Sequence, residues 1–134
     1  MALVKRFEDL HAWQEARRLT VRVYRLTSQE PLARDFGLRD QLQRAAVSVM
    51  ANIAEGFDCE SPAEFARFLE IARRSAVEVQ SLLYVTLDAG YLSQETFDEF
   101  YALTEKVKAL TGGLRAAQYR RSPKRGAQRT SRST

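Results

Sequence analysis

Apolar residues recur at helical spacing in four segments of the chain, and residues typical of helix ends separate these segments. Asp9, Ser61 and Ser93 are the predicted N-caps. Gly56 is predicted to end the second helix in a left-handed conformation, and Gly90 is predicted to end the third. Strand-like alternation of useful length is absent from the sequence. The pattern predicts an all-α protein, an antiparallel up-down four-helix bundle with helices at about 9–27, 38–55, 62–89 and 94–118.

The first and third helices carry more detailed expectations. At the start of the third, the residues Ser-Pro-Ala-Glu at 61–64 combine a capping serine, a proline in the first helical position and a glutamate that can bond back to the cap. The segment 28–37 contains a proline and a glycine and is predicted to be a loop. The inward face of the first helix is predicted to contain Trp13, Ala16, Thr20, Val23 and Tyr24.

The second helix carries a polar row on an otherwise apolar surface. The row occupies one narrow arc and consists of Gln41, Arg44, Ser48, Asn52 and Glu55. One flank of the row is apolar and is predicted to face the core. The other flank contains Val47, Ala51 and Ala54, where the outer helix of a monomer would normally carry charges.

This second flank predicts a contact between copies of the chain. The small side chains of Ala51 and Ala54 would let another backbone approach closely. The polar row would then form a hydrogen-bonded seam, because buried polar groups must be paired. Ser75 and Glu78 of the third helix are expected to meet this seam, with an ion pair between Glu78 and Arg44. The alternative is a solvent-facing polar stripe. A catalytic role is not expected, because no nucleophile or perturbable base accompanies the row.

The same helix resembles a known family. Residues 41–48, QLQRAAVS, and 52–56, NIAEG, resemble the signature of the four-helix-bundle family of 23S ribosomal RNA intervening-sequence proteins. The similarity extends over about 7–114. Val49 stands where the family usually has isoleucine, and Arg74 stands where it often has glycine, so that a long cation enters a position of close helix packing.

The resemblance implies partners and an assembly that the residue pattern does not. It implies a homo-oligomeric ring, a homopentamer. Related proteins include the accessory protein of diversity-generating retroelements, which works with a reverse transcriptase and RNA. The intervening-sequence members themselves have no established biochemical activity, so the resemblance implies no catalytic residues.

The positive charge of the chain belongs to its C-terminal end. The formal net charge is +4, but six basic residues and no acidic ones follow Tyr119, so the part before Arg120 has a charge of −2. The segment 120–134 is predicted to be a disordered basic tail. Its candidate nucleic-acid-binding residues are Arg120, Arg121, Lys124, Arg125 and Arg129. The alternative is a solubilising terminus. No aromatic residue in this segment offers a base-stacking platform.

A second basic feature lies on the first helix. His11, Arg18, Arg22 and Arg25 share one side of it, and a ring would repeat this stripe around the assembly. Repeated cations bind phosphate backbones by releasing counterions. Glu15 lies in the same sector, and the alternative interpretation is a solvated charged face.

The sequence offers little for catalysis or metal binding. His11 is the only histidine, and the only cysteine, Cys59, lies beside Asp58 and Glu60, which disfavour its thiolate. Zinc-ligand spacings and glycine-rich phosphate loops are absent from the sequence. We therefore expect no enzyme activity, no cofactor and no metal. The single cysteine and the lack of a membrane-length apolar run indicate a cytoplasmic protein.

Together these features predict a non-enzymatic, ring-forming four-helix-bundle protein. It is expected to bind RNA or DNA electrostatically, as an accessory to a nucleic-acid-processing partner such as a reverse transcriptase. The alternative is a protein–protein assembly scaffold with no nucleic-acid role.

Overall fold

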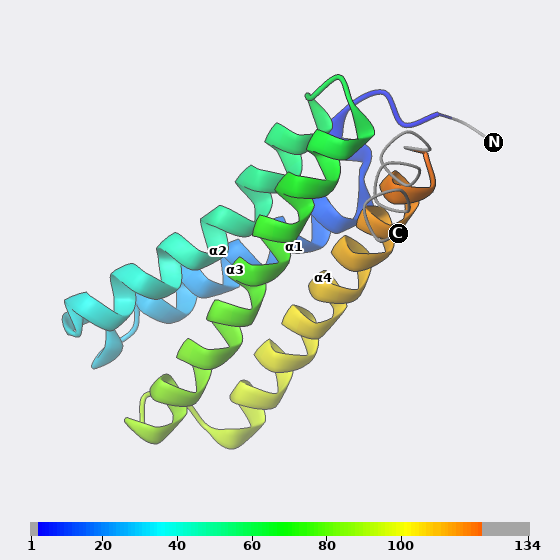
Figure 1. The fold of residues 1–134 in the computed structure, drawn as a ribbon. Helices are drawn as coiled ribbons and strands as arrows, with labels where there is room; N and C mark the ends of the chain where they lie inside the picture. Colours follow the sequence, from blue (N-terminus) through cyan, green and yellow to red (C-terminus); the bar gives the residue numbers. More distant parts are fainter. Residues whose placement is uncertain (1–2, 122–134) are drawn as a thin grey trace, which may run out of the picture.

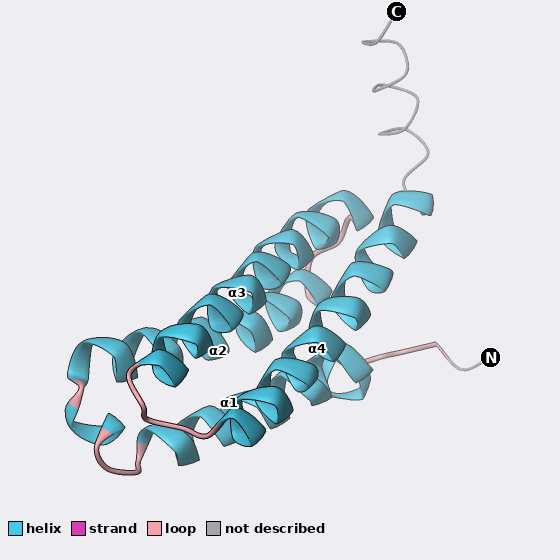
Figure 2. Cartoon of the chain, turned by 90° about the horizontal axis from the view of Figure 1, so that it is seen from below, coloured by secondary structure: helices cyan, strands magenta, loops and turns pink. Residues whose placement is uncertain are grey.

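The computed structural model describes residues 3–121, and the regular structure within that range is entirely helical. Four α-helices and two short 3-10 helices follow one another in the order η1 (Phe7–Asp9), α1 (His11–Thr27), η2 (Leu32–Arg34), α2 (Phe36–Phe57), α3 (Pro62–Asp88) and α4 (Gln94–Arg120). Figure 2 shows these helices joined by loops, with no strand in the described range. The prediction of an all-α protein with four helices is confirmed for residues 3–121.

Helices that are consecutive in the sequence lie side by side. α3 packs against α2 and α4, and α1 packs against α2 and α4. The α1–α2 and α3–α4 connections lie at one end of the molecule (Figure 1). The α2–α3 connection lies at the other end, together with both ends of the described chain. These short connections bring the predicted apolar faces together.

The core lies where the four helices face one another. Its large, fully enclosed apolar side chains come from every α-helix and include Leu19, Val23, Leu42, Val49, Ile53, Leu69, Val79, Leu83 and Val107. Four buried threonines share this interior: Thr27, Thr86, Thr104 and Thr111. Each donates its hydroxyl hydrogen to the carbonyl oxygen four residues earlier, at 2.7 or 2.8 Å. The hydroxyl groups are therefore satisfied within their own helices and add no unpaired polar atom to the core.

Side-chain caps fix the start of three α-helices. Ser61 Oγ accepts the backbone N–H of Glu64 at 3.1 Å, and Ser93 Oγ accepts that of Thr96 at 3.1 Å, so these two predicted caps are confirmed. α2 is capped by Asp35, whose side chain accepts the N–H three residues further on. The second helix therefore begins at Phe36, two residues earlier than predicted, and the predicted loop residue Gly37 lies in its first turn.

The prediction that Asp9 caps α1 is wrong. Asp9 is the last residue of η1, and Leu10 occupies the N-cap position of α1 without a side-chain hydrogen bond. Leu10 is buried, so its apolar packing against the core fixes this helix start in place of a polar cap.

The prediction that Gly56 ends α2 is also wrong. The helix continues through Phe57, and Gly90 is the glycine that adopts a positive φ, 80°, at the end of α3. A Cβ atom at Gly56 would lie 2.7 Å from the Cβ of Phe68 and 2.9 Å from Cδ1 of Phe65. Gly56 therefore serves the close approach of α2 to α3, beside the loop that joins them.

The inward face of α1 is rotated relative to the prediction. Ala16 and Val23 are buried as expected, but Tyr24 is 45% exposed and Trp13 is only half-buried. The core face is centred on Leu19, so the two aromatic residues lie towards its edges. Thr20 is half-buried and donates to the carbonyl oxygens of Ala16 and Ala46, which ties α1 to α2.

The first two residues of the predicted basic tail belong to the end of α4. Arg120 is the last residue of α4, and Arg121 is its C-cap. Residues 122–134, which include Lys124, Arg125 and Arg129, lie outside the described part of the chain.

Candidate nucleic-acid and assembly surfaces

Three predicted nucleic-acid-binding arginines lie together on the outer side of α1. Arg18, Arg22 and Arg25, joined by Arg17, line an open hollow of about 560 Å³. The side chains of Arg22 and Arg25 make no ion pair or hydrogen bond with any other residue in the described range. Their guanidinium groups therefore remain available for an anion, and we call this area the α1 arginine surface.

Glu15 partly neutralises the α1 arginine surface. It accepts hydrogen bonds from Nη1 of Arg18 at 2.8 Å and from Nζ of Lys106 on α4 at 3.1 Å. Burial of the Glu15 carboxyl group opposes ionisation, but the hydrogen bond from Lys106 and the charge of Arg18 outweigh it and lower the pKa of Glu15. Glu15 therefore stays ionised and links α1 to α4, while the hollow keeps an excess of positive charge.

The arginines at the end of α4 do not extend this surface. Arg121 lines a different hollow, of about 680 Å³, beside Leu3, Val4 and the α2–α3 connection. His11, the first member of the predicted stripe, lines a third hollow that contains none of the α1 arginines. The structure thus brings together Arg18, Arg22 and Arg25 but separates them from Arg121.

The centre of the predicted polar seam is a contact within one chain. Ser48 Oγ and Ser75 Oγ lie 2.8 Å apart, which joins α2 to α3. Asn52 Nδ2 donates to the carbonyl oxygen of Ser48 at 2.8 Å and to its Oγ at 3.1 Å. Ser75 also donates to the carbonyl oxygen of Ile71. The half-buried Ser48 and Asn52 and the buried Ser75 therefore find hydrogen-bond partners without a second copy of the chain.

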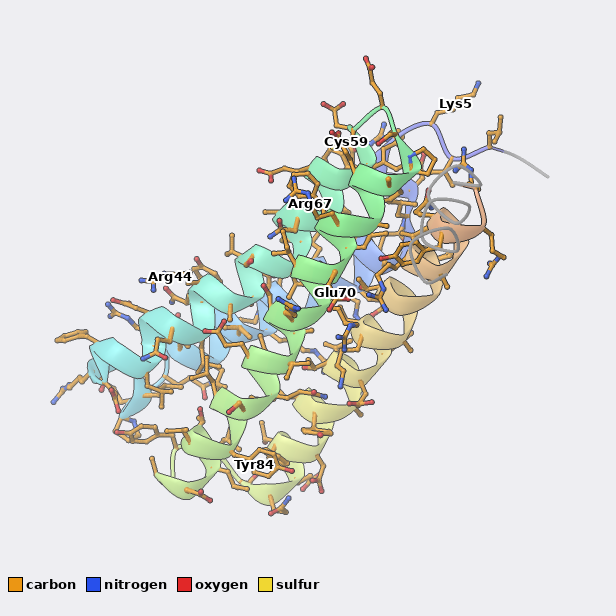
Figure 3. All side chains as sticks on the ribbon, viewed as in Figure 1. Lys5, Arg44, Cys59, Arg67, Glu70 and Tyr84 are labelled. Carbon is orange, nitrogen blue, oxygen red and sulfur yellow. The ribbon has the colours of Figure 1, made fainter. Side chains whose placement is uncertain are left out.

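The outer members of the seam have no such partners. Gln41, Arg44 and Glu55 on α2 are exposed, as is Glu78 on α3. Arg44 projects from the outer side of α2 (Figure 3), and it forms no ion pair with Glu78 within the described residues. The predicted Arg44–Glu78 pair is therefore absent inside one chain. A pair between two chains stays a prediction.

The predicted contact flank of α2 lies at the surface. Val47 is 39% exposed, and Ala51 and Ala54 are half-buried. The inward flank is enclosed as predicted: Leu42, Val49 and Ile53 are fully buried. α2 therefore has an apolar side in the core and a second apolar or small-residue side that faces outward.

The alternating charges of α3, which indicate ion pairs within this helix or with a neighbouring one, form a cluster with α4. Glu70 accepts hydrogen bonds from Arg73 at 2.9 and 3.3 Å and from Arg74 at 3.3 Å, and its second oxygen contacts Nη1 of Arg115 on α4. Hydrogen bonding from Arg73 is the main reason that the pKa of Glu70 is lowered, and the charge of Arg115 adds to it. We call these four residues the Glu70 cluster. Figure 3 shows Glu70 between the two helices.

The part of the Glu70 cluster that lies on α3 can be predicted from the sequence. Glu70 stands three and four residues before Arg73 and Arg74, so the sequence indicates pairing along the helix. Arg115 is 45 residues away, and only the packing of α4 on α3 brings it to the carboxylate.

A second polar group joins α3 and α4 nearby. Gln80, which is buried, donates to Glu105 at 2.7 Å, and Lys108 donates to both Gln80 and Glu105 at 3.1 Å. The hydrogen bond from Gln80 and then that from Lys108 lower the pKa of Glu105. Here one cation meets one carboxylate, in contrast to the three arginines around Glu70.

Metal and membrane features are absent from the part of the chain that is described. Within residues 3–121, no three histidine, cysteine or acidic side chains gather in a way that could hold a metal ion. Over the same residues, none of the helices combines the length and the apolar character needed to cross a membrane.

Burial and a hydrogen bond to Glu64 raise the pKa of the Cys59 thiol, which therefore favours its protonated form.

The fold and these surfaces define an all-α, four-helix protein with an arginine surface on α1 and a small apolar flank on the outer side of α2. A family comparison agrees with this class. The model of the 23S rRNA-intervening sequence protein family matches residues 8–113. The chain belongs to this family, and the resemblance inferred from the second helix is confirmed.

A solved structure has the same fold. It is the crystal structure of a protein of unknown function from the S23 ribosomal protein family of Bacteroides thetaiotaomicron. The alignment has a TM-score of 0.73 and 21% sequence identity, and it covers 78% of this chain and 95% of that one. No curated protein matches the chain.

Proposed function

We propose that this chain is a non-enzymatic protein that binds RNA or DNA through phosphate contacts. It acts as an accessory to a nucleic-acid-processing partner such as a reverse transcriptase. The observation that carries the proposal is the α1 arginine surface, where Arg22 and Arg25 have no partner within the described residues. Arginine guanidinium groups suit phosphate oxygens because they present several donors in a planar fork. The family's description, which names 23S rRNA, supports a nucleic-acid context.

The proposal includes assembly. The chain is an antiparallel up-down four-helix bundle that forms a homo-oligomeric ring, a homopentamer. The outward flank of α2 supports a contact with a second copy, because Val47, Ala51 and Ala54 leave it without charge. A ring repeats the α1 arginine surface in every subunit, and several weak phosphate contacts then add to a higher avidity.

Salt dependence of binding tests this function. The full-length chain is titrated into a short, fluorescently labelled single-stranded RNA while anisotropy is measured between about 50 and 200 mM salt. We expect a linear fall of log affinity with log salt, with a slope of about −0.7 for each phosphate contact. Binding that is undetectable at the lowest salt, or unchanged across the range, contradicts the proposal.

Two variants locate the contact. The triple variant Arg18→Gln, Arg22→Gln, Arg25→Gln is expected to lose at least about tenfold in affinity and to flatten the salt slope. The control neutralises three exposed cations elsewhere, Lys5→Gln, Arg6→Gln and Arg34→Gln, and is expected to change affinity much less. Removal of residues 122–134 leaves α4 intact and measures the share contributed by Lys124, Arg125 and Arg129.

A second function, a protein–protein assembly scaffold, is favoured by the exposed apolar side chains of α3. Ile71, Val77, Tyr84 and Val85 are between 37% and 51% exposed. Such residues mark protein contact surfaces when they gather on one element. A scaffold predicts partner binding that is insensitive to salt and unaffected by the triple arginine variant.

A further inference from the structure

The Glu70 cluster holds more positive charge than a structural ion pair requires. Three arginines, Arg73, Arg74 and Arg115, contact one carboxylate, which leaves the group with a net charge of +2. The neighbouring Glu105–Lys108 pair on the same helix boundary is balanced. An ion pair that only fastens α3 to α4 would need no more than Glu70 and Arg115.

The donors of the cluster are not used up by Glu70. Each guanidinium presents several N–H groups, whereas a carboxylate has only two oxygens. Nε of Arg115 is enclosed and has no hydrogen-bond partner among the described residues. The side chain of Arg74 is 78% exposed and uses only its Nε towards Glu70. An anion with several oxygens could therefore accept hydrogen bonds from the terminal nitrogens of Arg74, which the carboxylate leaves unused.

The side of α4 beside the cluster carries a further cation and a glycine. Lys108, Gly112 and Arg115 stand at i, i+4 and i+7 and share one side of α4. A Cβ atom at Gly112 would meet nothing within 4 Å, so no other side chain crowds this point on the α4 backbone. Lys108 is held in place by Gln80 and Glu105. Cations from both helices thus lie near a point of α4 that carries no side chain.

We propose that the Glu70 cluster is a receptor for a phosphate group, in which Glu70 holds the arginines in position and Arg74 and Arg115 donate to the phosphate oxygens. The phosphate belongs to the backbone of the bound nucleic acid. This part of the inference rests on the proposed function and adds a second contact surface, on the boundary of α3 and α4, to the one on α1.

Two matched pairs of variants test the receptor in the RNA anisotropy titration. Arg74→Gln is compared with Arg34→Gln, because the two side chains are 78% and 81% exposed and each makes one ion pair. We expect Arg74→Gln to lower RNA affinity about fivefold and to reduce the salt slope by about 0.7, while Arg34→Gln has little effect.

The second pair separates local from overall charge. Glu70→Gln and Glu105→Gln make the same change in net charge on the same α3–α4 boundary. Glutamine keeps an oxygen that can hold the arginines in position but removes the negative charge that competes with the phosphate, so we expect RNA affinity to rise several-fold more than in Glu105→Gln. A purely structural role of Glu70 predicts lower stability with no gain in affinity. Thermal melts of each variant confirm folding.

Inorganic phosphate distinguishes the sources of the anion. The Nε–Hε resonances of Arg74 and Arg115 are followed by NMR during titration with phosphate and with RNA. Shifts with both ligands, together with the expected effects of the variants, support the receptor. If only phosphate shifts the resonances and Arg74→Gln leaves RNA affinity unchanged, the assignment of nucleic acid as the ligand is wrong. The cluster is then a site for a free oxyanion.

Two further outcomes keep the two proposals apart. In the first outcome, the wild type binds RNA and the triple α1 variant loses affinity, but the two variants of each matched pair behave alike and the Arg74 and Arg115 resonances do not shift. This result overturns the phosphate receptor and leaves the proposed function standing. If phosphate shifts the resonances while no RNA binds at any salt concentration, the proposed function fails and the oxyanion receptor remains.

Discussion

α3 meets its two neighbours by different means. Against α2 the contact is steric and uncharged: Gly56 admits the side chains of Phe65 and Phe68, and the hydroxyl groups of Ser48 and Ser75 lie 2.8 Å apart. Against α4 the contact carries polar and charged groups in addition to apolar packing. The Glu70 cluster and the group around Gln80 and Glu105 lie along that boundary.

The difference indicates which substitutions each boundary tolerates. The α2–α3 boundary depends on the absence of a side chain at Gly56. Because the two helices are closely packed there, any added atom must push them apart. The α3–α4 boundary depends on solvent-accessible ion pairs, whose individual contributions to stability are small and fall with salt. We therefore expect the largest losses of stability from added volume at Gly56 and smaller ones from lost charge at Glu70.

Substitution of Gly56 is expected to have the largest effect. In Gly56→Ala the new Cβ would lie 2.7 Å from the Cβ of Phe68, which is fixed to the α3 backbone, so the two helices must separate. We expect the free energy of unfolding to fall by about 2 kcal/mol or more, despite the better helix propensity of alanine. Chemical denaturation measures this change.

Gly112→Ala is the matched control for that substitution. Gly112 also lies inside a helix, but its added Cβ would meet nothing within 4 Å. The control is expected to stabilise the protein by up to about 1 kcal/mol, because alanine is the better helix former. Equal effects of the two substitutions would show that Gly56 has no special steric role.

The hydroxyl pair of Ser48 and Ser75 is expected to contribute less. Each single alanine substitution removes the 2.8 Å contact, and we expect a loss of about 1 kcal/mol from either. The double variant should lose little more than a single one, because the two share one interaction. A double-mutant cycle by urea unfolding checks this coupling, and fully additive losses would exclude it.

Glu70 is expected to contribute least, and its contribution should depend on pH. Hydrogen bonding from Arg73 places its folded-state pKa below the ordinary value of 4.5. Its stabilisation is therefore complete above that value and is lost as the pH falls through the lower, folded-state pKa. Near neutral pH we expect Glu70→Gln to cost about 1 kcal/mol or less.

Urea unfolding at two pH values checks the sign. The difference in stability between wild type and Glu70→Gln should shrink between about pH 7 and about pH 3. A difference that stays constant or grows on acidification would show that the ionised carboxylate is not the stabilising form.

The sequence predicts those parts of the fold that depend on local pattern. Helical spacing of apolar residues locates all four helices, and Ser61 and Ser93 cap two of them as expected. Gly56 is misassigned because a glycine near a helix end is equally consistent with a left-handed terminus and with close packing. Only the position of Phe68 on the neighbouring helix distinguishes the two.

The surfaces are less predictable because they combine distant residues. Arg18, Arg22 and Arg25 are found from helical spacing alone, since they share one helix. The contact between Glu70 and Arg115 joins residues on two helices, and no periodicity within either helix indicates it. Helical spacing does bring Ser75 of α3 to the polar row of α2, and the structure shows that its contact with Ser48 lies within one chain rather than between chains.

The proposed ring depends on one contact, in which a second copy of the chain covers the outward flank of α2. Sedimentation equilibrium of the full-length protein at micromolar concentration measures this assembly, because it gives the mass without reference to shape. We expect a single species of five times the 15.3 kDa of one chain. A species with the mass of one chain, with Val47 and Ala51 open to solvent, would contradict it.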